Sequence, residues 1–563
     1  MAAAATAALT ILAHWPAVHN GFVHWDDPFY LGKVSQLKRI SPESLAWIAT
    51  ALPGYYQPFA WFSHLVDFQI WGWNLAGHHA TSILLHGVNT ALVCILVWML
   101  TGTVGNLSPS IRLAMAAGVA LAFGIQPLQV ESVAWLAERK TVLCGMFSLL
   151  SLCAYAVAVS GDVRRHWWWT TVALFLAALL SKPMAVSLPI VMLAMDYYPL
   201  RRQTRLGWRR LIREKWILLA TGVALGIVTI VSQSHAGAVT GLGGFGVMAR
   251  GFVAARNILF YVWKLIWPAW LSPYYPLEGK IPLGDVEFVG SLVGVIAFTA
   301  LAFWRRRQIP VLWSAWWAYL ALIAPVSGLL QVGAQGAGDR FMYLAMIPLL
   351  ILAATGVVWL WRYFSGMGRG VLVVLLVCWL LFCGLRTRGQ IATWHDDETL
   401  WTTTVGYFPD SVLANWKLSL ALVDQQRYDE ALTHARKAAW LDPTFAPIRA
   451  TVGEIYGKTH QDRESVTELQ EALRLKPDLV DARYALACAY SRLGLFSEAY
   501  RTLQELLAVE PSYAHEAATD KELAGLRDSP EFSVRMHRLL NDGSAKSFRF
   551  DTGAGYIPDQ GAR

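Results

Sequence analysis

The chain has 563 residues, of which 55% are hydrophobic and only 15% are charged, and its mean hydropathy is +0.39. Soluble domains carry about 25% charged residues, so this composition excludes an ordinary water-soluble globule and indicates a membrane protein. Six cysteines in this length exclude a disulfide scaffold, and the apolar content excludes an intrinsically disordered chain. A net charge of +8 is compatible with a nucleic-acid partner, so the positions of the basic residues along the chain are needed to test that possibility.

Apolar stretches long enough to cross a bilayer, which takes roughly 17–25 residues, recur along the first two thirds of the chain. Eleven spans are predicted, at 2–19, 80–100, 111–126, 141–160, 167–181, 184–199, 216–232, 288–304, 311–330, 341–361 and 371–386. The fifth and sixth are short and meet at Lys182-Pro183, which favours a tight hairpin. The first lacks a basic leader, so we interpret it as a retained span and not as a signal peptide.

Basic residues between the spans predict the sidedness of the bundle. They gather at Arg164–His166, Arg201–Lys215 and Arg305–Arg307, and all three clusters fall on the cytoplasmic side if the N-terminus lies inside. The net charge is then explained by topology, and no nucleic-acid partner is predicted. The loop at 20–79, the segments around 131–138 and 331–340, and everything after 387 fall outside. Residues 250–270 are apolar but carry spaced cations, which favours an amphipathic helix on the outer face.

A repeat follows the last span. Pro443, Pro477 and Pro511 recur at intervals of 34 residues, and small and apolar residues recur in register with them. This period is typical of tetratricopeptide repeats, which are paired helices that stack into a surface for peptides or partner proteins. The predicted fold is therefore all-α, a polytopic membrane bundle followed by a soluble solenoid. Its expected parts are a multispan domain at 1–387, a linker helix at 388–411, three repeats at 412–515, and a C-terminal helix with a flexible tail at 516–563.

Asp26 and Asp27 are candidate catalytic residues, since they follow the first span within an aromatic patch. Adjacent carboxylates repel each other, and burial raises the pKa of a carboxyl group, so one of the pair could act as a general base. The alternative is an Asp pair that ends a helix at the Pro28 turn.

Further polar residues are expected on the outer side. The candidates for binding a substrate headgroup are Glu131, Glu138, Arg139, Lys140, Lys182, Arg256, Arg340, His78 and His79. Arg340 can hold a lipid phosphate through two parallel hydrogen bonds, although an arginine that snorkels to the headgroups is an open alternative. His78 and His79 have no Cys, His or Asp partners at metal-ligand spacing, so no metal site is predicted.

Several motifs occur here in the order found in one known family. They are Trp25-Asp26-Asp27-Pro28, Gly77-His78-His79, Val130 to Lys140, Ser181-Lys182-Pro183-Met184, Asp196-Tyr197-Tyr198-Pro199-Leu200, Leu271 to Pro276, and Asp339 to Leu344. With the trailing repeats, the chain resembles the TMTC-type (transmembrane and tetratricopeptide repeat) O-mannosyltransferases and their bacterial relatives over about 20–515. That family is similar to the GT-C glycosyltransferases. The chain departs from its relatives at Gln126 and Gln129, where they commonly have His, and at Thr141, where they commonly have Asp.

The resemblance implies a membrane glycosyltransferase that moves a mannose-like sugar from a polyprenyl-phosphate carrier to a protein hydroxyl, with inversion. It implies Asp26 or Asp27 as the base, Glu131 as a second acidic residue in the catalytic site, and Arg340 with Lys182 at the carrier phosphate. No cofactor is required, and a divalent cation is an open alternative. The implied partners are the donor lipid, an acceptor polypeptide on the repeats and the bilayer, with the site on the non-cytoplasmic face, in a bacterial inner membrane.

Two other classes of protein stay open at this point. A membrane-anchored repeat scaffold for envelope protein assembly would not need Asp26, Asp27, Glu131 and Arg340 to converge. A transporter would show internal two-fold hydropathy symmetry and charged residues at mid-membrane depth, and neither is clear in the sequence.

Overall fold

The computed structural model describes residues 1–32, 34, 39–50, 56–105, 107–160, 165–235, 246–277, 285–329 and 335–550. The chain divides into two compact units, Met1–Thr399 and Leu400–Arg563. Both are helical, as the composition and the repeat predict, and the first carries a single small sheet among its described residues.

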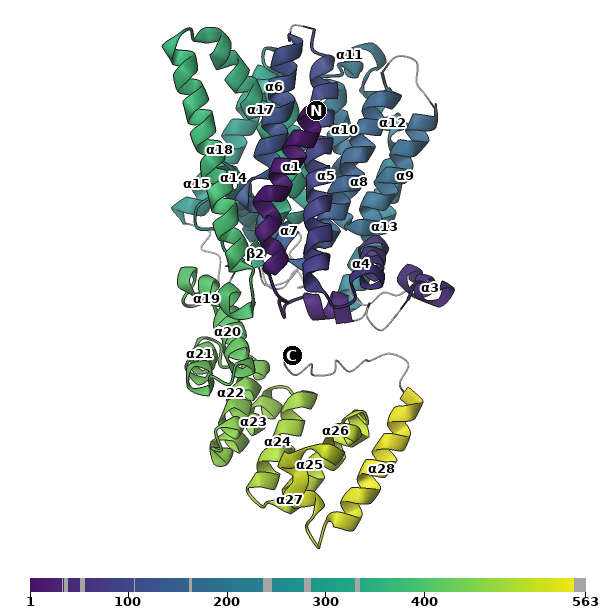
Figure 1. The fold of residues 1–563 in the computed structure, drawn as a ribbon, viewed down its shortest axis with the longest axis vertical. Coiled ribbons are helices and arrows are strands. Elements are labelled where there is room, and N and C mark those ends of the chain that lie inside the picture. The colour runs from purple at the N-terminus through teal and green to yellow at the C-terminus, as the bar shows by residue number, and fades with distance from the viewer. Residues whose placement is uncertain are drawn as a thin grey trace. The chain divides into compact units, whose positions relative to one another are not determined.

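The first unit is a bundle of helices (Figure 1). Its longer helices are α1 (Ala2–His14), α3 (Pro42–Thr50), α4 (Pro58–Trp71), α5 (Leu75–Gly102), α6 (Pro109–Gly124), α8 (Arg139–Ala158), α9 (Arg165–Ser181), α10 (Leu188–Tyr197), α13 (Trp216–His235), α14 (Val247–Ile266), α15 (Val286–Trp304), α16 (Pro310–Ile323), α17 (Met342–Tyr363) and α18 (Met367–Thr393). Short helices lie between them at α7 (Val130–Ala134), α11 (Arg202–Leu206) and α12 (Trp208–Glu214). Each of the predicted apolar ranges therefore coincides with a helix.

The predicted count of eleven spans is not confirmed. Among the described residues, five helical stretches are long and apolar enough to cross a membrane: Leu75–Gly102, Leu136–Ala158, Val286–Arg307, Asp339–Tyr363 and Met367–Thr393. A bent pair, Pro109–Gly124 with Pro127–Ala134, would add a sixth. Of the remaining predicted spans, α1 with 13 residues, α9 with 17, α10 with 10 and α16 with 14 are shorter helices, and in α13 the apolar stretch is Trp216–Thr229.

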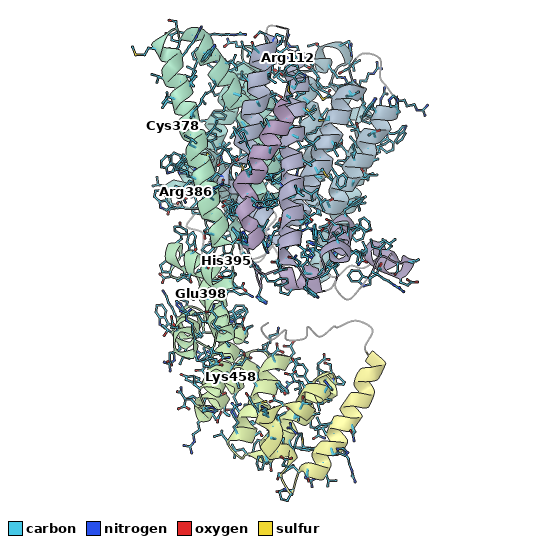
Figure 2. The ribbon with its side chains drawn as sticks, in the orientation of Figure 1. Arg112, Cys378, Arg386, His395, Glu398 and Lys458 are labelled. Carbon is cyan, nitrogen blue, oxygen red and sulfur yellow. The ribbon has the colours of Figure 1, made fainter. Side chains whose placement is uncertain are left out.

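Burial separates the centre of the bundle from its rim. The span that contains α8 is 72% buried, whereas those of α15 and α18 are 6% buried although they are strongly apolar. An apolar helix that protein does not cover suits contact with lipid, because hydrocarbon satisfies its side chains. Cys378 lies on the exposed side of α18 (Figure 2). The helices α5 and α8 therefore form the core, and α15 and α18 form part of its outer surface.

Close helix approach in the core depends on glycine. A Cβ atom on Gly124 of α6 would lie 2.0 Å from Thr10 Oγ1 of α1, and one on Gly145 of α8 would lie 2.5 Å from the Tyr343 ring of α17. Distances this short cannot be tolerated, so both positions need a residue without a side chain. Gly124 thus lets α6 approach α1, and Gly145 lets the start of α17 lie beside the start of α8.

Two short strands order the segment that leads into α17. β1 (Tyr275–Pro276) pairs antiparallel with β2 (Gln335–Ala337), with Tyr275 opposite Ala337. Tyr275 also donates a hydrogen bond to Asp339 Oδ1 at 3.0 Å. The sheet thereby fixes the backbone that presents Asp339 and Arg340.

The second unit contains three consecutive helix pairs followed by a C-terminal group. The pairs are α20 (Val412–Asp424) with α21 (Tyr428–Leu441), α22 (Ala446–Lys458) with α23 (Asp462–Leu475), and α24 (Val480–Arg492) with α25 (Phe496–Val509). The C-terminal group is α26 (Tyr513–Thr519), α27 (Ala524–Arg527) and α28 (Ser533–Phe550). Ala431, Ala472 and Ala499 are fully buried in the pairs, as the repeated small residues predict. The helix α19 (Asp397–Tyr407) occupies part of the predicted linker, and the predicted tail beyond 550 lies outside the described residues.

Candidate functional site

A buried carboxylate with three cations around it marks one end of the bundle. Lys182 Nζ lies 2.8 Å from Glu138 Oε2, and Lys140 Nζ and Arg340 Nε lie 3.3 Å and 3.4 Å from Glu138 Oε1. All four side chains are at most 11% exposed. The structure therefore brings together four of the residues that the sequence singles out, and we call Glu138, Lys140, Lys182 and Arg340 the Glu138 cluster.

Local backbone breaks place these residues. Trp135 is extended and separates α7 from a 3-10 turn at Leu136–Glu138, so Glu138 projects from a turn just before α8. Lys182 is extended and precedes Pro183, which disfavours helical geometry at Lys182 and ends α9 there. Glu138 and Lys182, which lie at these two helix breaks, therefore contact each other at the end of the bundle.

Glu131 is the second carboxylate that contacts Arg340, besides Glu138. Arg340 donates its backbone N–H to Glu131 Oε2 at 2.8 Å, and its guanidinium donates to Glu131 Oε1. The guanidinium also lies 5.4 Å from the centre of the Trp135 ring. Glu131 is 2% exposed, so its charge is compensated by Arg340 and not by water.

Asp26 and Asp27 have different surroundings, although they are adjacent. Asp27 is 1% exposed and accepts hydrogen bonds from the backbone N–H groups of Val23 at 3.1 Å and Ala137 at 2.8 Å. Burial raises the pKa of Asp27, which lies in the loop after α1, to about 7, and these two hydrogen bonds oppose the shift. Asp27 thus fastens the loop to the turn that presents Glu138.

Asp26 points to the edge of the cluster. Its side chain is 34% exposed, and Asp26 Oδ2 lies 3.8 Å from Lys140 Nζ. Lys140 is therefore shared between Asp26 and Glu138. Of the two adjacent carboxylates, Asp26 is the one that a substrate can reach.

Arg139 and His78 belong to a separate buried network, so their geometry does not support the headgroup-binding role predicted for them. Arg139 is fully buried and donates to Asp67, to the carbonyl of His78 and, at 3.1 Å, to the Ser82 hydroxyl. His78 Nε2 lies 2.9 Å from the carbonyl oxygen of Gly72. These contacts join α4, α5 and α8, and they use the hydrogen-bonding groups that a ligand would need.

His79 and Arg256 are also not brought to the cluster by any contact among the described residues. His79 is fully buried beside the backbone of Asn20 and Gly21. Arg256 Nε lies 2.6 Å from Glu287 Oε1, in an ion pair whose side chains are 34% and 60% exposed. Arg256 therefore links α14 to α15 at the surface, because its nearest anion is there.

Two members of these networks are not among the predicted site residues, although Thr141 is one of the positions at which the chain departs from its relatives. Thr141 donates to Glu138 and accepts a hydrogen bond of 2.6 Å from Lys182, so it completes the cluster. Asp67 is the anion that holds Arg139. The sequence signal for Asp67 is an aspartate in the mostly apolar helix α4, where a buried carboxylate needs a cation nearby.

The cluster and its two neighbours are balanced in charge. Asp26, Glu131 and Glu138 offer three carboxylates against the cations of Lys140, Lys182 and Arg340. Among the residues that the structure describes, no three His, Cys, Asp or Glu side chains are grouped to hold a metal ion. The arrangement can bind an anion through its three cations and can take up a proton at Asp26, provided that the ligand replaces part of the carboxylate contacts.

The combination of apolar helices, a polar site at a bundle end and a helical-repeat unit defines a membrane-associated helical protein with a tetratricopeptide region. Comparison with known proteins agrees with this class. The tetratricopeptide repeat family model matches residues 480–513, which are α24 and α25 with the turn that follows. Repeats of this family commonly form surfaces that bind other proteins.

One curated relative is human protein O-mannosyl-transferase TMTC1. The chain is 24% identical to it over 217 residues, which cover 37% of this chain and 24% of the relative. The matched region thus spans about a quarter of that protein. Among solved structures, the chain is similar to the MamA protein at 19% identity over 29% of this chain and 87% of that one, with a TM-score of 0.24. A TM-score this low does not establish a shared fold.

Proposed function

We propose that the protein is a membrane glycosyltransferase that moves a mannose-like sugar from a polyprenyl-phosphate carrier to a protein hydroxyl on the non-cytoplasmic face. The observation that carries the proposal is the partly exposed carboxylate of Asp26 beside the cations of the Glu138 cluster. A sugar phosphate needs both features, since a base must take a proton and cations must stabilise the leaving phosphate. The similarity to TMTC1 supports the same class of reaction.

Asp26 is the proposed base. The acceptor hydroxyl oxygen attacks the anomeric carbon, its proton passes to the Asp26 carboxylate, and the bond from that carbon to the phosphate oxygen breaks. The phosphate leaves with the bonding electron pair, and the sugar stereocentre inverts. Asp27 is a positioning residue, because both of its oxygens already accept backbone hydrogen bonds.

Arg340 and Lys182 are the proposed phosphate ligands. Arg340 offers a planar guanidinium whose paired N–H groups match two phosphate oxygens, and Lys182 adds a point charge. Both cations contact carboxylates in this structure, Glu131 and Glu138 respectively, so donor binding exchanges carboxylate contacts for phosphate contacts. Electrostatic stabilisation of this kind needs no metal.

Aromatic side chains support a sugar beside the base. The Trp25 ring stacks on the Trp135 ring at a centroid distance of 5.0 Å, and Trp135 stacks on Trp394 at 5.3 Å. Trp25 is partly exposed and adjoins Asp26 in sequence. Its indole is a flat apolar surface on which the apolar face of a sugar ring can pack.

The test is transfer of a radiolabelled sugar from a polyprenyl-phosphate donor in membranes that contain the full chain. We expect transfer to protein with the unchanged chain and a loss of about 10²–10⁴-fold with Asp26→Asn, the range for removal of a general base. Asp410→Asn is a matched control, since that exposed aspartate lies in the second unit. Full transfer by Asp26→Asn would refute the proposed base.

A second candidate function is a membrane-anchored scaffold, which the repeat match at 480–513 favours. In this case the second unit would recruit partners and the bundle would serve as an anchor. The same experiment separates the two functions, because a scaffold gives no transfer from any polyprenyl-phosphate sugar and yet retains its partners when Asp26 is replaced.

A further inference from the structure

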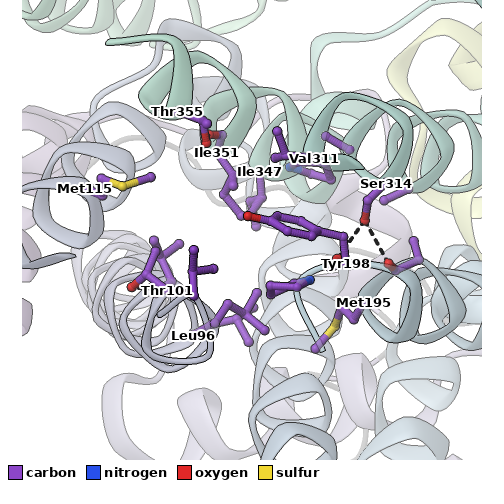
Figure 3. Close-up of a pocket in the computed structure, with 18 of the residues that line it drawn as sticks. Leu96, Thr101, Met115, Met195, Tyr198, Val311, Ser314, Ile347, Ile351 and Thr355 are labelled. Carbon is purple, nitrogen blue, oxygen red and sulfur yellow. Dashed lines mark hydrogen bonds between the residues drawn. The ribbon is translucent and has the colours of Figure 1, made fainter. Parts of the chain in front are cut away.

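A cavity lies inside the bundle along α17, with a volume of about 420 Å³. Its walls come from α5, α6, α8, α10, α16 and α17, and they are mostly aliphatic (Figure 3). The volume lies in the range of about 300–1,000 Å³ that is usual for sites that hold small molecules. None of the residues of the Glu138 cluster lines it, so it is a site of its own.

The cavity follows one face of α17. Leu344, Ile347, Ile351, Thr355 and Arg362 line it at spacings of three, four or seven residues, which place them on one side of a helix. At 1.5 Å per residue this stripe is about 27 Å long. A hydrocarbon core of about 30 Å contains two leaflets, so one acyl chain along the membrane normal reaches about 15 Å, and the stripe is long enough to take such a chain.

The threonine and serine hydroxyls in the cavity wall already donate hydrogen bonds within the protein, so they have no donor left for a ligand. Thr101 donates to the carbonyl of Val97 at 2.7 Å, and Thr355 donates to that of Ile351 at 2.8 Å. Ser314 lies 2.8 Å from the carbonyl oxygens of both Ala194 and Tyr198, as Figure 3 shows. An unbonded polar group of a ligand would be left without partners along these walls, so the body of the cavity suits hydrocarbon.

Polar groups line the cavity at one end. Arg362 lies in the last turn of α17, and Tyr198 directly follows α10. Both helices start near the Glu138 cluster, which contains Arg340 before α17 and Lys182 before α10, so Arg362 and Tyr198 lie at the opposite end of the bundle. The Tyr198 ring extends into the cavity (Figure 3). A guanidinium and a phenol at the end of an apolar cavity match a phosphate attached to a hydrocarbon chain.

We propose that this cavity binds one acyl chain of an anionic phospholipid, with the lipid phosphate against Arg362. The phospholipid belongs to the leaflet at the Arg362 end, and the site is independent of the proposed sugar transfer. A phosphate that contacts Arg362 lies at the Arg362 end of the cavity, so the headgroup belongs to the leaflet at that end.

The experiment uses the purified full chain in nanodiscs and a phosphatidylglycerol that carries a photoreactive diazirine on its acyl chain. After irradiation, mass spectrometry maps the labelled peptides. We expect labels in the segment 344–362, and Arg362→Gln reduces them about tenfold, the effect of losing one hydrogen bond to a charged group. Arg307→Gln is the matched control, because Arg307 is exposed and does not line the cavity. It leaves the labelling unchanged.

Three further arms decide the source and the location of the chain. The zwitterionic phosphatidylcholine analogue keeps the phosphate but adds a choline cation beside it, so we expect it to label 344–362 less than phosphatidylglycerol does. Ala318→Trp, which fills the cavity, abolishes the label while the melting temperature shows that the variant is folded. Equal labelling by both phospholipids, unchanged labelling in Arg362→Gln, or labelling only by a polyprenyl phosphate with a diazirine on its chain would each overturn the proposal. The last result would assign the cavity to the carrier.

Discussion

Two buried polar clusters in the bundle use the same kinds of residues in different ways. In the first, Asp196 accepts hydrogen bonds from Tyr155 at 2.6 Å and Arg202 at 3.0 Å on one oxygen, and from Lys215 at 2.6 Å on the other. Arg202 also pairs with Glu214 at 2.9 Å. Asp196 and Lys215 are completely buried. Every charge in this cluster has an opposite charge in contact, although Glu214 is 22% exposed, and none of these residues lines the cavity along α17.

Together with Asp26 and Glu131, the Glu138 cluster has the same balance of charge, but it is open at its edge. Asp26 is 34% exposed and makes only a 3.8 Å contact with Lys140, while Lys182 is 11% exposed. The comparison teaches that charge balance alone does not distinguish a structural cluster from a reactive one. Exposure and spare bonding capacity on one carboxylate make the difference.

The largest expected effect is on stability at the closed cluster. Asp196→Asn leaves Lys215 and part of Arg202 buried without their anion, which costs about 3–5 kcal/mol when one partner of a buried pair is removed. Thermal melting in detergent measures the loss, and sugar transfer per folded molecule stays at the level of the unchanged chain. A melting temperature equal to that of the unchanged chain would show that the Asp196 cluster does not hold the helices together.

The next effect is on transfer at the open cluster. Arg340→Gln removes the proposed phosphate ligand, and we expect transfer to fall about 10²–10³-fold, as when a preorganised donor to a developing charge is lost. Because this change also leaves Glu131 unpaired, the matched control is Arg340→Gln with Glu131→Gln. The double variant regains stability without regaining transfer. Recovery of transfer in the double variant would mean that Arg340 acts only as the partner of Glu131.

A smaller effect concerns the pH dependence of stability at Asp27. Its pKa is about 7 in the folded protein and about 4 when unfolded, so the folded state holds a proton that the unfolded chain has released between these values. The contribution is present at low pH and is lost as pH rises through 7, at about 1 kcal/mol per pH unit. Asp27→Asn flattens melting temperature against pH in this window, whereas Asp26→Asn keeps most of the slope, because burial is the largest cause of the raised Asp27 pKa and the Asp26 charge is a smaller one. An unchanged slope in Asp27→Asn would contradict the raised pKa.

The smallest effect is expected at Arg256. Its ion pair with Glu287 is largely exposed, and such pairs contribute about 0–1 kcal/mol. Arg256→Gln should change neither melting nor transfer measurably. A loss of transfer would place Arg256 at the site after all and would weaken the distinction between open and closed clusters.

Periodicity carries most of what the sequence predicts of the fold. The repeat of Pro443, Pro477 and Pro511 predicts three helix pairs, and all three are present with small residues buried between them. Apolar runs locate helices equally well, but they do not determine which helices cross the membrane. The helix α10 is an example. Its apolar sequence ends in buried polar residues such as Asp196, and such a sequence is equally compatible with a helix packed inside the protein and with a membrane span.

The site is only partly predictable. Glu131, Glu138, Lys182 and Arg340 stand out as charged residues at the ends of apolar runs, and the structure brings them together. Spacing does not reveal that Glu131 pairs with a residue 209 positions away, or that the neighbouring Arg139 turns into a different network. These outcomes depend on tertiary packing, because adjacent residues at the start of a helix point in different directions.

Side-by-side assay of Asp26→Asn and Asp27→Asn for transfer from a radiolabelled polyprenyl-phosphate sugar tests the central claim most directly. The account predicts that Asp26→Asn loses transfer while its melting temperature is retained, and that Asp27→Asn keeps more transfer but melts differently with pH. Transfer that survives Asp26→Asn and disappears with Asp27→Asn, in protein that is still folded, would contradict it.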